Sequence, residues 1–178
     1  IIVSTGATYD HEIEYASKIL NKIKKFALLH CVSIYPTPLK ELNLKRIGFL
    51  KKYSKKVGFS DHSIGIDKNK NFACKAAIYY GANYLERHIR IFNFDKSKDG
   101  IVSILPNDIK DIINFSNLSK QDQLLHLKEN YKIKYEKTLG SKHRNLTHTE
   151  LLNRNYYRGR FASFKKKQII NNWEETPI

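Results

Sequence analysis

Methionine is absent from the 178-residue sequence, and cysteine occurs only twice. Because there is no initiator methionine and the sequence opens on the apolar stretch Ile1–Val3, we expect a piece of a longer protein. Cys31 and Cys74 lie far apart and form no CxxC pair, which excludes a cysteine-based zinc site. Two buried free thiols in a reducing compartment are expected instead.

Long hydrophobic runs are missing as well. No stretch of about 18 apolar residues occurs, which excludes a membrane-spanning helix by the usual length criterion. The apolar start lacks the basic region and the small-residue cleavage site of a secretory signal. Together with the cysteine usage, these absences predict a cytoplasmic protein with no membrane partner.

Acidic residues are few beside basic ones, with 17 Asp and Glu against 32 Lys and Arg, a formal net charge of +15. Such a balance fits nucleic acid, an anionic membrane surface or small anionic substrates. The charges are spread along the expected helices, which is typical of a solvated surface. Hydrophobic residues make up 41% of the sequence, so a packed core is expected and disorder is not.

Four units of strand, turn and helix follow one another along the sequence. Short apolar runs, typical of buried strands, occupy residues 1–3, 26–31, 57–59 and 84–91. Helical periodicity follows at about 10–24, 42–52, 71–80 and 106–118. This alternation predicts a parallel α/β sheet, either open and doubly wound or half of an eight-stranded barrel. A complete barrel needs about 250 residues, so four units in about 120 residues amount to half of one.

Single residues mark where several helices begin and end. Asp10 fits an N-cap, Gly81 fits the residue after a helix, and Pro106 fits the first turn of the next one. Pro36 and Pro38 exclude a helix directly after the second strand.

The composition changes after about residue 120. Residues 121–137 are polar and charged, and Asn153–Lys167 mixes arginines with aromatic residues. We therefore divide the sequence into an α/β unit over 1–120, a helical linker over 121–150 and the start of a small second domain over 151–178. The mixed segment and a pI of about 9.7 leave a nucleic-acid-binding module as an alternative, although no known binding motif occurs and nucleic acid is not the expected partner.

Polar residues leave the strands in pairs two positions apart, so both members of a pair share a face. The pairs are Ser33 with Tyr35, Ser60 with His62, and Glu86 with His88. Sites in parallel α/β folds lie at the carboxyl ends of the strands, where His62 and His88 should face one another with Glu86 one layer deeper.

Two imidazoles beside a carboxylate suit a divalent metal such as manganese and leave coordination positions open for substrate oxygens. A histidine at a strand end is also often just hydrogen-bonded into the rim, and that alternative stays open. Asp61 either contributes to substrate binding or caps the next turn.

Three motifs follow in order at the expected strand ends. They are LLHCVSIYPTP over Leu28–Pro38, GFSDHSIG over Gly58–Gly65 and LERH over Leu85–His88. With VSTG at Val3–Gly6, they resemble four successive segments of the N-acetylneuraminate (sialic acid) synthase family, which includes the legionaminic and pseudaminic acid synthases. The resemblance covers most of residues 1–120.

The resemblance implies a (βα)8 TIM-type barrel, here only its last four βα units, followed by the start of a small C-terminal antifreeze-like (SAF) domain. It implies a C–C bond-forming transferase that condenses phosphoenolpyruvate with an N-acetylated amino sugar, such as N-acetylmannosamine, to a nonulosonic acid and phosphate. Mn²⁺ or Mg²⁺ is the implied cofactor, and a homodimer is the implied state of the full-length protein.

By position in the motifs, the resemblance implies that His62 and His88 are metal ligands and, with Glu86, catalytic. Glu86 would act beside the sugar as an acid/base or hydroxyl-binding group. The positions implied to bind substrate are Ser33, Tyr35, Ser60 and Asp61.

The sequence also departs from the family pattern. The first four barrel strands are missing, and with them the lysines that grip phosphoenolpyruvate, so this chain alone is expected to be inactive and to need the missing half-barrel. Asp95–Gly100 differs from the Pro-Gly-Pro-Asp-His type of segment, which leaves the sugar unassigned. No residue matches the arginine that a partner subunit's second domain supplies, and a non-catalytic remnant of the family stays open.

Overall fold

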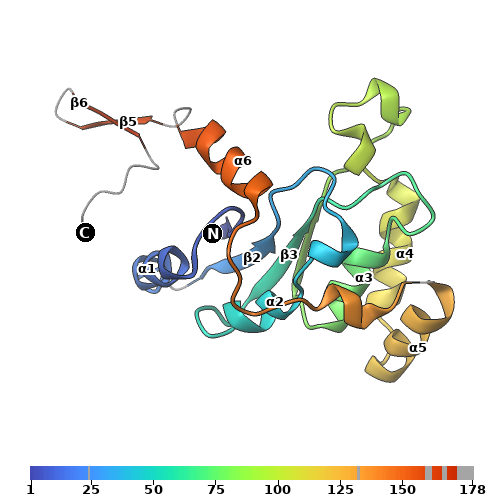
Figure 1. Cartoon of the computed structure of the whole chain (residues 1–178). Helices are drawn as coiled ribbons and strands as arrows, with labels where there is room; N and C mark the ends of the chain where they lie inside the picture. The colour runs from blue at the N-terminus through green and yellow to red at the C-terminus, as the bar shows by residue number, and fades with distance from the viewer. Residues whose placement is uncertain (24, 132, 159–161, 166–167, 172–178) are drawn as a thin grey trace.

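The computed structural model describes residues 1–23, 25–131, 133–158, 162–165 and 168–171. Its main sheet consists of four strands: β1 (Ile2–Ser4), β2 (Ala27–Cys31), β3 (Val57–Asp61) and β4 (Tyr84–Arg87). Each strand pairs in parallel with the next, in chain order (Figure 1). The predicted parallel α/β sheet is therefore confirmed, and the strand order lacks the reversal of a doubly wound sheet.

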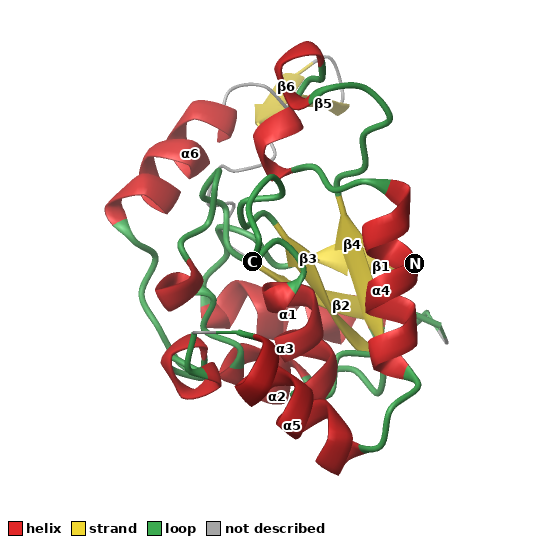
Figure 2. Cartoon of the chain, turned by 90° about the vertical axis from the view of Figure 1, so that its right-hand side faces the viewer, coloured by secondary structure: helices red, strands yellow, loops and turns green. Residues whose placement is uncertain are grey.

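Helices follow the strands along the chain, and further helices come after the last strand of the main sheet (Figure 2). They are α1 (Asp10–Leu20), α2 (Lys45–Leu50), α3 (Phe72–Tyr79), α4 (Pro106–Ser116), α5 (Lys120–Asn130) and α6 (His148–Arg158). Short 3₁₀ turns occupy η1 (Leu39–Glu41), η2 (Phe94–Lys96), η3 (Gly100–Val102) and η4 (Tyr135–Thr138). Among the described residues, every helix is too short or too polar to traverse a lipid bilayer.

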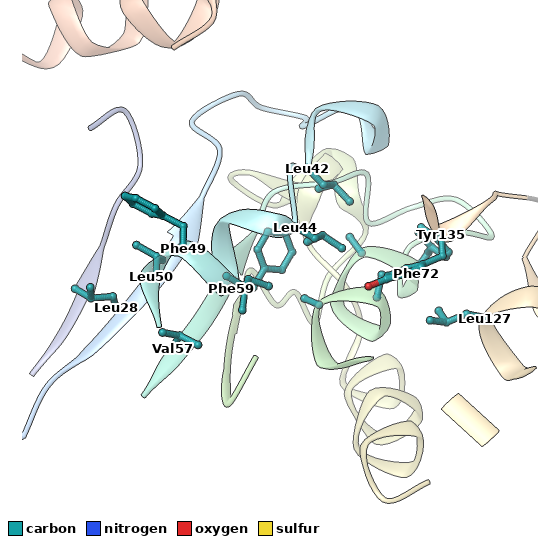
Figure 3. Packing of buried hydrophobic residues seen from close by; sticks show 14 of the residues in the cluster. Leu28, Leu42, Leu44, Phe49, Leu50, Val57, Phe59, Phe72, Leu127 and Tyr135 are labelled. Carbon is teal, nitrogen blue, oxygen red and sulfur yellow. The ribbon is translucent and has the colours of Figure 1, made fainter. Parts of the chain in front are cut away.

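The core lies between one face of the sheet and helices α2 and α3 (Figure 3). Leu28, Val57 and Phe59 alternate along the strands toward this side, which is why they meet the helices. Each is at most 1% exposed, and full burial of one such side chain stabilises the fold by about 1.5–3 kcal/mol. The opposite face is less covered, since Ile2 is 60% exposed and Tyr84 40%.

Three predicted elements are shorter than the sequence pattern indicates. The first helix, expected over about 10–24, ends at Leu20. The helix expected over 42–52 is reduced to α2 because Asn43 has a left-handed φ of 50°, which interrupts a helical path. The amides of Leu44 and Lys45 donate to the carbonyls of Thr138 and Leu139, at 3.0 and 2.9 Å. The fourth strand ends at Arg87 rather than residue 91, since beyond it the chain pairs with another segment through an isolated parallel bridge between Ile89 and Ile104.

Two of the three predicted helix-boundary residues, Gly81 and Pro106, are confirmed, and Asp10 is displaced by one position. Asp10 is the first residue of α1 rather than its N-cap, which is Tyr9. Gly81 has a φ of 99°, the left-handed conformation expected of a glycine after a helix. Pro106 opens α4 as predicted, because the first turn of a helix needs no amide donor there.

After residue 120 the chain packs against the core again before it runs away from the main sheet. Leu127 of α5 and Tyr135 of η4 are buried in the same apolar cluster as α3. The described residues end in an antiparallel pair, β5 (Ala162–Lys165) with β6 (Gln168–Asn171). The side chains of residues 155 and 157–178, most of the predicted start of a second domain over 151–178, lie outside the described part of the chain.

Candidate active site

The carboxyl ends of β2, β3 and β4 bring five of the predicted site residues together. The rings of His62 and His88 face one another with centroids 5.5 Å apart and planes inclined by 60°. The Tyr35 ring lies 4.1 Å from that of His62 and 6.3 Å from that of His88. One layer deeper, the Ser60 hydroxyl donates to the Glu86 carboxylate at 2.6 Å. The geometric expectation for these side chains is confirmed.

His62 is held by two different partners. Its Nδ1 lies 3.3 Å from the Val32 carbonyl, which can only accept, so Nδ1 carries the proton. Its Nε2 then accepts from the Tyr35 hydroxyl at 3.0 Å. Burial lowers the pKa of His62, which favours the neutral ring. The orientation leaves the Nε2 lone pair directed toward Tyr35 at the open end of the site.

His88 follows the end of β4 and is more open, with a side chain 36% exposed. Its backbone carbonyl accepts from Ile104, and its Nδ1 lies 4.0 Å from a carboxylate oxygen of Asp99. Asp99 was not among the predicted site residues. It lies in the loop after the strand, where neither strand alternation nor the motifs apply, and its backbone has a left-handed φ of 56°.

Cys31 lies in the same face as the site and was also missed. Strand pairing sets it opposite Ser60, and its Sγ is 3.8 Å from His62 Nδ1. Burial raises the pKa of the Cys31 thiol, despite hydrogen bonds from neighbouring serines, so the thiol is protonated at neutral pH. Alternation alone could have found it, because it precedes Ser33 by two positions. Both cysteines are buried and free, as expected.

Ser33 lies against the loop that follows β1. A Cβ on Gly6 would come within 2.6 Å of Ser33 Oγ and 2.9 Å of Cys31 Sγ, so only glycine allows the two loops to approach this closely. The Ser33 carbonyl accepts from the Asn153 side chain at 2.6 Å, which links this loop to α6.

Asp61 is not brought to the site. It lies on the opposite face of β3, is completely buried, and pairs with Arg87 at 2.8 Å. One of its oxygens accepts from the Ser63 amide at 2.8 Å, which is the turn-capping alternative, and the other accepts from the Cys74 thiol at 3.1 Å. The expected contact of Asp61 with substrate therefore has no geometric counterpart here.

A complete protein-only metal site is absent from the part of the chain that the structure describes. No group of three or more His, Cys, Asp or Glu side chains in it is arranged to hold an ion. His62 and His88 can contribute two ligands, and any further ones must come from elsewhere.

Fold and site together define an α/β protein whose polar site lies at the carboxyl edge of a parallel sheet. Residues 1–139 match the model of the NeuB family, and the chain therefore belongs to that family, the sialic acid synthases. It is 38% identical over 118 residues to the N,N'-diacetyllegionaminic acid synthase of Campylobacter jejuni, covering 62% of this chain and 33% of that protein.

Two solved structures have a fold similar to that of this chain. The spore coat polysaccharide biosynthesis protein SpsE of Bacillus subtilis matches with a TM-score of 0.66 and 27% identity over 87% of this chain and 42% of that one. The N-acetylneuraminic acid (sialic acid) synthetase of Leptospira borgpetersenii, solved with citrate, matches with a TM-score of 0.56 and 28% identity over 89% and 49%. The chain spans about a third of the length of the curated relatives it matches.

Proposed function

We propose that this chain is half of the barrel of a synthase that condenses phosphoenolpyruvate with an N-acetylated amino sugar, giving a nonulosonic acid and phosphate. The observation that carries the proposal is the cluster of Tyr35, His62, His88 and the Ser60–Glu86 pair at the carboxyl ends of neighbouring strands, in a member of the NeuB family. α/β barrels bind their substrates at this edge.

The remaining four βα units belong to the proposed active form. Four parallel strands in chain order, with helices packed on one face, are what half of a (βα)8 barrel requires. The lysines that bind phosphoenolpyruvate in the family would come from the other half. We therefore propose that residues 1–178 alone are inactive, and that the residues after α6 begin an antifreeze-like domain.

The two histidines, His62 and His88, are suited to supply part of the ligand set of a divalent metal ion. With Nδ1 protonated and bound to the Val32 carbonyl, His62 has a neutral Nε2 that would ligate a metal in place of its hydrogen bond from Tyr35, the usual arrangement of a ligating imidazole and its outer partner. His88 reaches the same space from the next strand. A bound Mn²⁺ or Mg²⁺ would supply Lewis-acid polarisation of the sugar aldehyde.

Each remaining side chain has a proposed task. Ser33 and Tyr35 bind phosphoenolpyruvate with their hydroxyls, and Ser60 orients the Glu86 carboxylate by donating to it. Glu86, exposed on the open face of the sheet, binds a sugar hydroxyl or exchanges a proton with it. In the overall reaction, C3 of phosphoenolpyruvate bonds to the aldehyde carbon, water adds to C2, and phosphate leaves with cleavage of its C–O bond.

The test uses the protein with all of its barrel strands present, assayed for phosphate release from phosphoenolpyruvate with N-acetylmannosamine and Mn²⁺. His62→Ala and His88→Ala should each lower the rate by about 100-fold or more, because each removes one of two metal ligands. Chelation should abolish release, and added Mn²⁺ should restore it.

His148→Ala is the matched control, since His148 is exposed at the start of α6. It should retain the wild-type rate. A folded wild-type protein that releases no phosphate with N-acetylmannosamine or other N-acetylated hexoses would contradict the proposed activity.

A further inference from the structure

Helix α6 lies beside the loops that follow β1 and β2, at the same edge of the sheet as the site (Figure 1). Two consecutive residues of α6, Asn153 and Arg154, make the contacts. Their partners, Ser33 and Ala7, precede them by 120 and 147 positions. Local sequence cannot account for such contacts, which depend on how the chain returns across the sheet.

Asn153 holds the loop after β2. Its side-chain amide donates to the Ser33 carbonyl at 2.6 Å. Two residues further on, the Tyr35 hydroxyl donates to His62. The backbone that carries the Ser33 and Tyr35 hydroxyls is thus anchored from outside the loop.

Arg154 holds the loop after β1. One guanidinium nitrogen donates to the Ala7 carbonyl at 2.7 Å and to Glu12 at 3.0 Å, and the other donates to Glu12 at 2.5 Å. The guanidinium also lies 4.9 Å from the centre of the Tyr9 ring. A planar, multidentate donor is needed for this set of partners, which lysine could not satisfy.

The two loops constrain one another. Ala7 has a φ of 51°, in the left-handed region that non-glycine residues rarely adopt, so its conformation depends on its surroundings. The preceding Gly6 lies directly against the Ser33 side chain. A displacement of either loop therefore displaces the other.

The start of α6 is itself firmly fixed. Glu150 is completely buried, and its carboxylate accepts two hydrogen bonds from Arg144, at 2.6 and 2.7 Å, and one from the Thr147 amide at 3.0 Å. Asn153 and Arg154 follow one turn later on this anchored helix. They therefore have the rigid support that a positioning residue needs.

We propose that Asn153 and Arg154 are positioning residues for the site, which hold the loops after β2 and β1 in the arrangement that presents Ser33 and Tyr35 to substrate. The identity of the substrate as phosphoenolpyruvate rests on the proposed function, whereas the effect of Asn153 and Arg154 on the two loops does not. Neither residue touches the reacting groups, so they act on substrate affinity more than on the chemical step.

The experiment measures two quantities in the protein with all of its barrel strands present. Hydrogen–deuterium exchange reports on residues 5–9 and 32–36, with residues 57–61 of β3 as an internal reference. Steady-state kinetics reports KM for phosphoenolpyruvate and kcat. The variants are Asn153→Ala, Asn153→Asp, which keeps the shape but loses the donor, and Arg154→Lys, which keeps the charge. Asn145→Ala, at an exposed asparagine before α6, is the control.

Each Asn153 variant and Arg154→Lys should speed exchange in both loops and leave β3 unchanged. KM should rise by about three- to tenfold, the size expected for one lost hydrogen bond, with kcat within about twofold. Loops that exchange at the wild-type rate in all three variants would overturn the proposal, and so would faster loops with an unchanged KM. If the wild type releases no phosphate, the proposed function fails, and exchange alone then decides whether α6 holds the loops.

Discussion

Ser60 and Asp61 are neighbours in β3 but face opposite sides of the sheet, and their expected roles differ accordingly. Ser60 meets Glu86 in the site, whereas Asp61 meets Arg87 in the interior. Asp61→Asn keeps the side-chain shape but leaves the Arg87 guanidinium, 5% exposed, without its opposite charge. We expect a loss of about 3–5 kcal/mol in the free energy of unfolding.

Urea unfolding of the protein with its complete barrel measures this loss. Ser60→Ala is the comparison, because it removes a hydroxyl that orients Glu86 and should lower phosphate release while changing stability by about 1 kcal/mol. An Asp61→Asn protein with wild-type stability and reduced substrate affinity would reverse the assignment and return Asp61 to a binding role.

Single residues of the site were predictable where strand alternation applied. It brought Ser60 and Glu86 to one face and His62 and His88 to one edge, as the structure has them. The same alternation places Asp61 on the opposite face, so its inclusion rested on the motif rather than on geometry. Asp99, in contrast, reaches His88 through the path of a loop, which no periodicity encodes.

At the scale of elements, a glycine joins the loop after β3 to the segment that runs beside His88. The Gly65 amide donates to the Ile101 carbonyl at 2.8 Å, and a Cβ on Gly65 would lie 2.4 Å from the Ser103 carbonyl oxygen. Gly65→Ala must therefore push this backbone away. We expect it to reduce the free energy of unfolding by about 1–3 kcal/mol.

Gly48→Ala provides the matched control for that measurement. Gly48 lies inside α2, and a Cβ there would make only ordinary contact with Tyr80 at 3.9 Å. Because alanine restricts the unfolded chain and favours helix, this change should stabilise the protein by about 0.4–1 kcal/mol. Equal effects of the two changes in denaturant unfolding would show that the close approach at Gly65 is unimportant.

The order and type of the first four strands and helices were predictable from apolar periodicity, but their lengths were not. α2 begins late because Asn43 has a left-handed φ beside the backbone bonds of Leu44 and Lys45 to residues 138 and 139. β4 stops short because the chain beyond it pairs with Ile104. In both cases a distant segment takes over the backbone hydrogen bonds, and a local pattern cannot reveal it.

For the whole molecule, the face of the sheet away from the helices is the feature with the largest consequence. At the amino ends of the strands lies a hollow of about 810 Å³, whose lining combines apolar side chains such as Ile2, Ala27 and Tyr84 with Lys25, Lys51, Lys52, Lys55 and Lys56. Ile2 and Tyr84 are 60% and 40% exposed, and among the described strands β1 and β4 each have a neighbour on one side only. We predict that residues 1–178 on their own self-associate and bind a hydrophobic dye.

Co-expression with a polypeptide that supplies the first four βα units should suppress both effects, as measured by light scattering and dye fluorescence. Ile2→Thr with Tyr84→Thr should weaken dye binding without the second polypeptide. A monomeric chain that unfolds cooperatively and binds no dye would contradict the prediction.

Membership of the synthase family was predictable, because three motifs at strand ends occur together in the right order. The sugar was not, since the loop after β4 departs from the family pattern and its described side chains Lys96 and Lys98 are exposed. In the proposed barrel, substrate choice would depend on surfaces contributed by several segments, and no single segment would encode it.

The segment from α5 to η4 limits how this sequence can change in length. Leu127 and Tyr135 fill part of the core, and the carbonyls of Thr138 and Leu139 receive the first amides of α2. An insertion or deletion between residues 121 and 139 would shift these partners out of register, whereas substitutions at exposed positions such as Gln121 and Lys134 should cost little stability. Over evolution, this stretch should therefore diverge in composition while its length stays nearly constant.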